Sequence, residues 1–173
     1  MTRYAAALAI MGFVGATSLL AGGKSANVVV HDAGGNQVGT AQITEAKRGG
    51  ILIRLKVRGL PLGDHAAHIH EQPKCEGPDF ASAGGHFNPE KKQHGLENPD
   101  GPHGGDLVNF NVAGKKRKAN VLLVNTHLNL NDGPNSVFTN GGTSLVIDAG
   151  VDDMKTDPSG KSGVHIACGV ITK

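Results

Sequence analysis

The sequence predicts an all-β domain of about eight strands, arranged as an antiparallel sandwich or flattened barrel with Greek-key connections. Three observations carry this prediction. Several short segments alternate aliphatic and polar residues with a period of two. Glycine is abundant, with 26 in 173 residues, whereas aromatic residues make up only 3%. No segment after residue 23 has the period of an amphipathic helix. A chain of this length forms one domain with a core of its own.

The clearest strands lie in the first third of the chain. Residues 27–31 form a strand candidate, the glycines at 34 and 35 mark a turn, and residues 37–46 alternate small apolar with polar side chains. Residues 51–58 give the strongest pattern, because the aliphatic residues Ile51, Ile53, Leu55 and Val57 alternate with Leu52, Arg54, Lys56 and Arg58.

Two long segments interrupt the strands. Residues 71–106 lose periodicity and are rich in Gly, Pro, Asn and His, and residues 149–163 form a second polar loop. A structureless stretch of the first length is uncommon in a compact domain unless something orders it. We expect a metal ion and a disulfide to do so. The remaining predicted strands are residues 68–70, 107–112, 118–126, 143–148 and 164–172.

The N-terminus has the pattern of an export signal. Arg3 is followed by an apolar stretch that ends in small residues, so residues 1–23 are predicted to be removed and residues 24–173 to form the domain. Gly23 stands where a lipoprotein signal would need cysteine, so no lipid can attach there. The alternative is an uncleaved membrane anchor, for which the stretch is short. We expect a periplasmic or otherwise extracytoplasmic protein with no stable membrane span after cleavage.

The formal net charge is only +2, which argues against a nucleic-acid partner. One basic run, at residues 115–118, follows Gly114 and precedes a predicted strand. A solvated hairpin turn is favoured over a polyanion site for so short a run.

The chain has two cysteines, Cys75 and Cys168. Two cysteines in an oxidising compartment usually pair, and the bridge would tie the His-rich segment to the last strand. The alternative is a pair of buried free thiols.

Six of the nine histidines lie between residues 65 and 103. In the motif His103-Gly-Gly-Asp106, the glycines allow the backbone to turn both side chains toward one ion. Together with His86 and His94, His103 and Asp106 provide three imidazoles and a carboxylate, a set that suits tetrahedral zinc. The alternative is a solvated polar loop, which leaves the ordering of thirty residues unexplained. His68 and His70 lie two residues apart on a predicted strand and therefore on one face, which indicates a second metal site beside the first.

The sequence resembles the copper/zinc superoxide dismutases of the bacterial secreted type, and the resemblance covers the whole chain after the predicted signal. The resemblance rests on His68-Ile-His-Glu71, Ser82-Ala-Gly-Gly-His-Phe-Asn-Pro89, His94-Gly95, Gly101-Pro-His-Gly-Gly-Asp-Leu107 and Gly163-Val-His-Ile-Ala-Cys-Gly-Val170. It implies an eight-stranded antiparallel Greek-key β-barrel with two long functional loops.

The resemblance also implies roles for individual residues. Zinc is held by His86, His94, His103 and Asp106, and copper by His68, His70 and His86, which bridges the two metals. Asp152 resembles the carboxylate that orients one ligand of each metal. Cys75 and Cys168 match the disulfide of the family.

Two positions depart from the family pattern, both at the implied copper site. Asp148 stands where a fourth copper-binding His is usual, and His165 stands where an Arg attracts superoxide. A carboxylate favours Cu(II) over the softer Cu(I), and His is mostly neutral at pH 7. Both changes would weaken catalysis, unless His165 itself binds copper in place of the missing imidazole.

The resemblance implies an antioxidant enzyme that converts superoxide to oxygen and hydrogen peroxide at His86 and His165, with zinc and copper as cofactors. The alternative is a zinc-binding, dismutase-like protein with little or no activity and a metal-binding or structural role. A plain adhesive β-domain does not explain the zinc ligands. The oligomeric state stays open, because no interface pattern stands out in the sequence.

Overall fold

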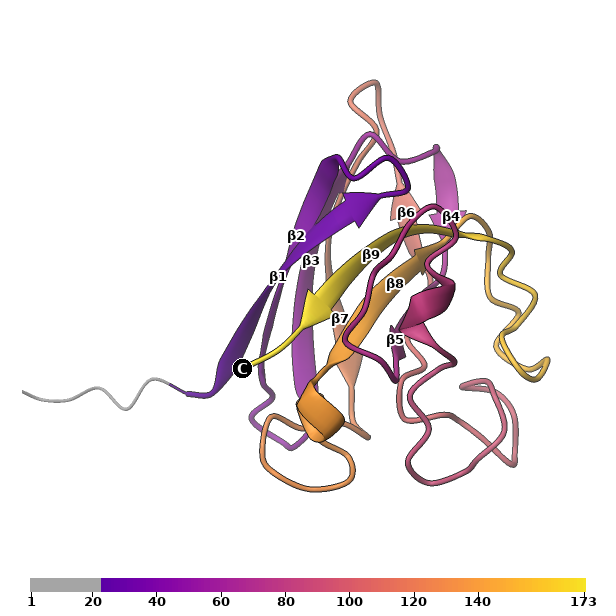
Figure 1. Ribbon diagram of the computed structural model, residues 1–173. Coiled ribbons are helices and arrows are strands. Elements are labelled where there is room, and N and C mark those ends of the chain that lie inside the picture. Colours follow the sequence, from indigo (N-terminus) through magenta and orange to yellow (C-terminus); the bar gives the residue numbers. More distant parts are fainter. Residues whose placement is uncertain (1–22) are drawn as a thin grey trace, which may run out of the picture.

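The computed structural model describes residues 23–173. The predicted export signal, residues 1–23, lies outside this part of the chain except for Gly23. The described part contains nine strands and two short 3-10 helices, and seven of the strands form a curled antiparallel sheet (Figure 1). The strands are β1 (Ser25–Asp32), β2 (Gln37–Glu45), β3 (Ile51–Arg58), β4 (Gly63–His65), β5 (Ala67–His70), β6 (Phe110–Val112), β7 (Lys118–Asn125), β8 (Thr143–Asp148) and β9 (His165–Ile171). The 3-10 helices are η1 (Ala81–Ala83) and η2 (Thr139–Gly141).

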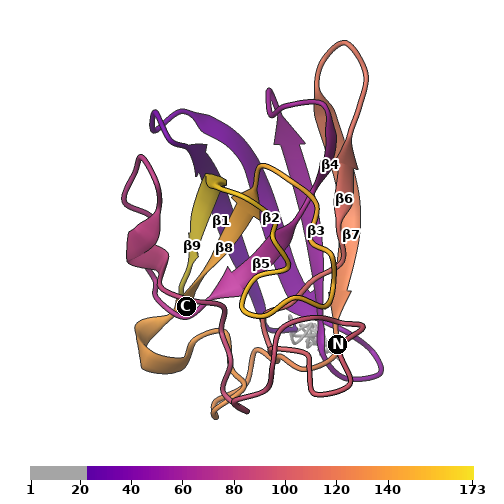
Figure 2. The same ribbon diagram turned by 90° about the vertical axis from the view of Figure 1, so that its right-hand side faces the viewer.

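The strands pair in the order β5-β8-β9-β1-β2-β3-β7, and β4 pairs with β6 in a small second sheet. The hairpin from β6 to β7 and the continuous segment from β4 to β5 link the two sheets, so the strands curl into a barrel (Figure 2). The predicted all-β Greek-key barrel is therefore confirmed. The basic residues 115–117 lie in the turn between β6 and β7, where the Arg117 N–H donates to the Gly114 carbonyl.

The predicted alternation of β3 directs its aliphatic residues inward. Ile51, Ile53 and Leu55 are fully buried, whereas Arg54 and Lys56 are exposed. The core that they join draws on every strand except β4, and most of the surface that it buries is aliphatic.

Two strand predictions were wrong in detail. The strand expected at residues 107–112 is shortened to β6, because the Asn109 side chain hydrogen-bonds the backbone of Asp152 in another loop. The strand expected at residues 68–70 is longer and divided, with β4 preceding β5 and Ala66 between them.

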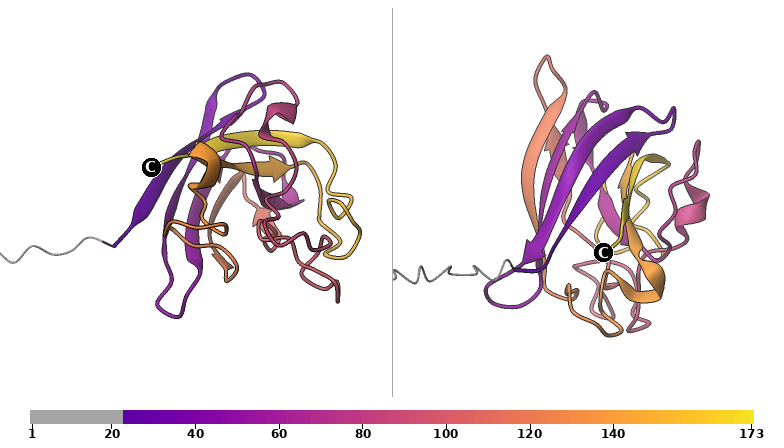
Figure 3. Two further views of the ribbon diagram at one scale, coloured as in Figure 1. Left: turned by 60° about the horizontal axis from the view of Figure 1, so that its bottom comes forward. Right: turned by 60° about the vertical axis from the view of Figure 1, so that its left-hand side comes forward.

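Both long loops lie on the same side of the barrel, away from β1 and β2 (Figures 1 and 3). The start of the first loop covers the outside of β8 and β9, where Phe80 and Ala83 pack on Val146 and Cys168. The predicted Cys75–Cys168 disulfide is present and fixes this cover to β9. Among residues 23–173, no helix is long and apolar enough to cross a membrane.

Candidate metal centre

Backbone hydrogen bonds bring the loop histidines to β5. The Phe87 N–H donates to the Ile69 carbonyl at 2.8 Å, and the Ile69 N–H donates to the Gly105 carbonyl at 2.9 Å. A side chain at position 105 would place its Cβ 2.1 Å from the Ile69 carbonyl oxygen, so only glycine allows this approach. The motif ending at Asp106 is thereby held against the strand that carries His68.

Three of the predicted ligands converge on the fourth, Asp106. Its Oδ1 lies 3.0 Å from Nδ1 of His86, 3.1 Å from Nδ1 of His94 and 3.5 Å from Nδ1 of His103. The Nδ1 atoms of His86 and His103 are also 3.5 Å apart. Ligand atoms bound tetrahedrally to Zn²⁺ at about 2.0–2.1 Å lie about 3.3 Å from one another. These four separations are close to that value, so the atoms fit ligands of one zinc ion.

The second oxygen of Asp106 is fixed by the backbone. Oδ2 accepts hydrogen bonds from the Gly95 N–H at 2.8 Å and from the His103 N–H at 2.9 Å. This leaves Oδ1 to face the imidazoles. Burial opposes ionisation of Asp106, but the imidazole hydrogen bonds outweigh it and hold the pKa of this carboxyl well below its usual range.

Asp152 contacts both groups of histidines. Its Oδ2 lies 3.0 Å from Nε2 of His68, and its Oδ1 lies 3.0 Å from Nε2 of His94. The Asn109 side chain holds the backbone of Asp152 through two hydrogen bonds, and the carboxylate is fully buried. Because a carboxylate oxygen only accepts, each Nε2 donates to Asp152, and each Nδ1 points away from it, toward Asp148 in His68 and toward Asp106 in His94.

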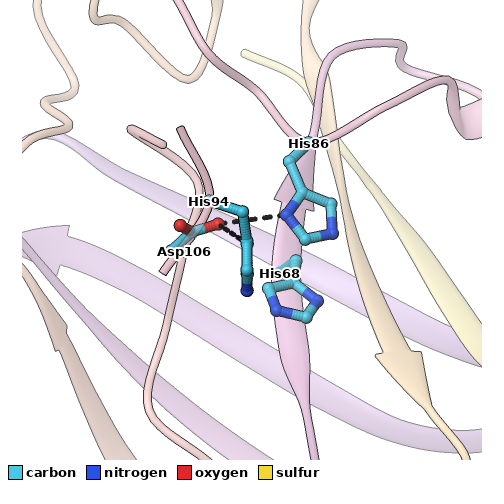
Figure 4. Close-up of side chains that lie close together, drawn as sticks. All are labelled: His68, His86, His94 and Asp106. Carbon is cyan, nitrogen blue, oxygen red and sulfur yellow. Dashed lines mark hydrogen bonds and ion pairs between the residues drawn. The ribbon is translucent and has the colours of Figure 1, made fainter. Parts of the chain in front are cut away.

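A second set of donors lies beside the first. The ring of His68 stacks on that of His86 with centroids 3.9 Å apart, and the His70 ring lies 5.0 Å from His86. Figure 4 shows how His68, His86, His94 and Asp106 converge, with one ligand atom of each within 4.8 Å of the others. His103, not His68, has its Nδ1 beside both Asp106 and Nδ1 of His86, whereas the two nitrogens of His68 face Asp148 and Asp152.

Two polar atoms of the second set are buried without a partner. His70 uses Nδ1 to donate to the Gly84 carbonyl at 2.8 Å, and its Nε2 has no hydrogen bond. Asp148 places Oδ2 2.9 Å from Nδ1 of His68, and its Oδ1 has no hydrogen bond. Buried polar atoms normally have partners, so this pair fits a bound cation. Burial lowers the pKa of His70 to about 3 and that of His86 to about 4, so both rings are neutral and able to bind metal.

His165 completes the surroundings of Asp148. Its Nε2 lies 3.8 Å from Oδ1 of Asp148, its ring lies 5.1 Å from that of His70, and its side chain is 27% exposed. The remaining histidines lie elsewhere. His65 supports the backbone, with Nδ1 2.8 Å from the Asp148 carbonyl oxygen, and His31 and His127 lie outside the cluster.

One residue near the cluster was not predicted. Asp157 accepts a hydrogen bond from the His94 N–H at 2.6 Å, and its Oδ1 lies 3.6 Å from Nε2 of His103. No local pattern identifies it, because it approaches from the second long loop, more than fifty residues away in the chain.

Comparison with known proteins gives a consistent result. Residues 37–171 match the family model described as copper/zinc superoxide dismutase. The chain is 48% identical over 139 residues to a Cu-Zn superoxide dismutase of Aquifex aeolicus, covering 79% of this chain and 81% of that protein. A SOD-like protein from Bacillus subtilis superposes with a TM-score of 0.80 at 36% identity, covering 84% of this chain and 97% of the other. The Cu/Zn superoxide dismutase of Brucella abortus gives 0.69 at 32% identity, covering 86% and 99%.

Proposed function

Because the chain belongs to the copper/zinc superoxide dismutase family, we propose that it dismutes superoxide at a centre holding zinc and copper side by side. The superoxide dismutase-like function follows from the family. The assignment of residues to each metal is our proposal, as is the catalytic activity of this particular centre.

Zinc is assigned to His86, His94, His103 and Asp106. The observation that carries the proposal is the spacing of their ligand atoms, which is 3.0–3.5 Å in four of the six pairs. Three imidazole nitrogens and one carboxylate oxygen are also donors that Zn²⁺ accepts in proteins.

Copper is assigned to His68, His70, His86 and Asp148. The support is the unpartnered Nε2 of His70 and the unpartnered Oδ1 of Asp148, both buried in residues that lie beside His165. Imidazole donors suit copper, and the carboxylate adds preference for its oxidised form. Since Nδ1 of His86 faces Asp106, the Nε2 atom across the ring is free for the second metal, so His86 serves both.

Copper held by these residues would supply a one-electron redox couple, through which one superoxide is oxidised to dioxygen and a second is reduced, with two protons, to hydrogen peroxide. The residues of the chain prepare this chemistry. Asp152 fixes the rings of His68 and His94, His86 connects the two sets, and the partly exposed His165 lies beside Asp148.

The proposed location is extracytoplasmic. The disulfide between Cys75 and Cys168 supports an oxidising compartment, and the predicted export signal agrees with it.

The test is to load the purified protein with zinc alone, copper alone or both, and to follow superoxide decay by stopped flow. We expect rapid decay only with copper, and its loss in a His70→Ala variant that keeps the four zinc ligands. If protein carrying both metals did not accelerate decay, the alternative of a zinc-binding protein without dismutase activity would replace this proposal.

A further inference from the structure

A β-bulge places His165 and Asp148 on the same face of the sheet. In the ladder between β8 and β9, Ile147 pairs with Ala167, yet the next residue, Asp148, pairs with His165. Ile166 is therefore an extra residue in β9. In a regular ladder without the bulge, Asp148 would oppose Ile166, and His165 would point to the other face. Bulges of this kind re-aim side chains near functional sites.

The tautomer of His165 is also determined by its contacts. Its Nδ1 lies 3.1 Å from the backbone oxygen of Asp79, which can only accept a hydrogen bond. Nδ1 therefore carries the hydrogen, and the neutral ring has its lone pair on Nε2. That lone pair is on the side of Asp148.

Two acceptors thus face each other across a short gap. Nε2 of His165 lies 3.8 Å from Oδ1 of Asp148, which is buried and has no hydrogen-bond donor. Two ligands of one metal ion, each about 2.0–2.1 Å from it, are at most about 4.2 Å apart. The gap is within this limit, and a cation between the two atoms would satisfy both.

The geometry points to His165 as a copper ligand, binding through Nε2 beside Asp148 and supplying the imidazole that Asp148 does not. This inference rests on the proposed copper site. Cu(I) prefers imidazole to carboxylate, so Asp148 alone leaves the reduced metal poorly held. With His165, the site offers the reduced metal a further imidazole next to His68 and His70, whose ring lies 5.1 Å away.

The experiment compares zinc-loaded full chains in a cycle of four proteins: the unchanged protein, His165→Gln, Asp148→His and the double variant. Cu(I) affinity is measured by competition with a chromophoric chelator, and the Cu(II) site by its electron paramagnetic resonance spectrum. His31→Gln is the matched control, because it removes a histidine outside the cluster. Zinc content and circular dichroism verify folding in each case.

We expect His165→Gln to weaken Cu(I) binding about tenfold or more and to change the Cu(II) spectrum, whereas His31→Gln changes neither. In the Asp148→His background the same substitution should cost less than about threefold, since an imidazole is already present there. If the unchanged protein binds copper and His165→Gln leaves both readouts unaltered, this inference is wrong and the proposed copper site stands. If the unchanged protein binds no copper, both are wrong.

Discussion

Replacement of Asp152 by Asn tests how one carboxylate serves both metals. Asp152 accepts hydrogen bonds from Nε2 of His68 and of His94, each at 3.0 Å, and Oδ1 also accepts the Met154 N–H at 2.6 Å. The amide of Asp152→Asn has one acceptor oxygen. That oxygen should stay at the Oδ1 position, where two donors need it, so the NH₂ group would face His68.

A donor facing Nε2 of His68 forces this ring into the tautomer with hydrogen on Nδ1, the atom needed for copper. Loss of an outer contact of this kind costs about 10–100-fold in metal affinity, or roughly 1.4–2.8 kcal/mol. We therefore expect Asp152→Asn to weaken copper binding by that factor and zinc binding by less than about threefold.

The assay is a competitive titration of each metal against a chelator of known affinity. Asp153→Asn is the matched control, because Asp153 accepts hydrogen bonds from Lys155 and Thr156 and contacts no imidazole. Copper affinity within twofold of the unchanged protein would refute the reasoning, and a larger loss of zinc than of copper would refute the assigned orientation.

Three further predictions follow from the same contacts. Removal of zinc should lower the midpoint of thermal unfolding by at least about 5 °C relative to protein in free zinc at about a hundred times its Kd. An unchanged midpoint would show that zinc does not order residues 71–106. The Gly160→Ala variant should bind less metal, because its Cβ would lie 1.7 Å from Oδ1 of Asp152. Gly163→Ala is the control and should keep its metal, because Gly163 also has a positive φ but no atom would lie closer than 3.9 Å to the added Cβ. Equal metal contents in the two variants would contradict this prediction. In metal-free protein, burial lowers the pKa of His70 to about 3 and of His86 to about 4, so stability that is complete above pH 6.5 is lost as pH falls toward 4. Although burial opposes its charge, hydrogen bonds to Asp106 and Asp152 raise the pKa of His94 to about 9, so its contribution is complete below pH 6.5 and lost as pH rises through 9. Urea midpoints should therefore peak near pH 6.5, and a flat profile would be evidence against these shifts.

Much of the barrel could be predicted because its strands carry local patterns. The alternation from Ile51 to Val57 places one face of β3 in the core without reference to any other strand. The Cys75–Cys168 pairing could be predicted for a different reason, since a chain with a predicted export signal and two cysteines offers one intramolecular pair.

The details of the site depend on contacts that no local pattern encodes. The extra residue Ile166 in β9 is visible only in the register with β8, yet it decides which face His165 occupies. Asp157 reaches His94 and His103 because the second loop folds over the first. Short β4 has too few residues for a period of two to stand out, so it was missed.

The most direct test of the two-metal centre is anomalous diffraction from crystals of the loaded protein, recorded at the zinc and copper absorption edges. Our account predicts a zinc signal among Nδ1 of His86, His94 and His103 and Oδ1 of Asp106. It predicts a separate copper signal on the other side of the His86 ring, next to His68, His70 and Asp148. A single position occupied at both edges, or no copper signal beside Asp148, would contradict it.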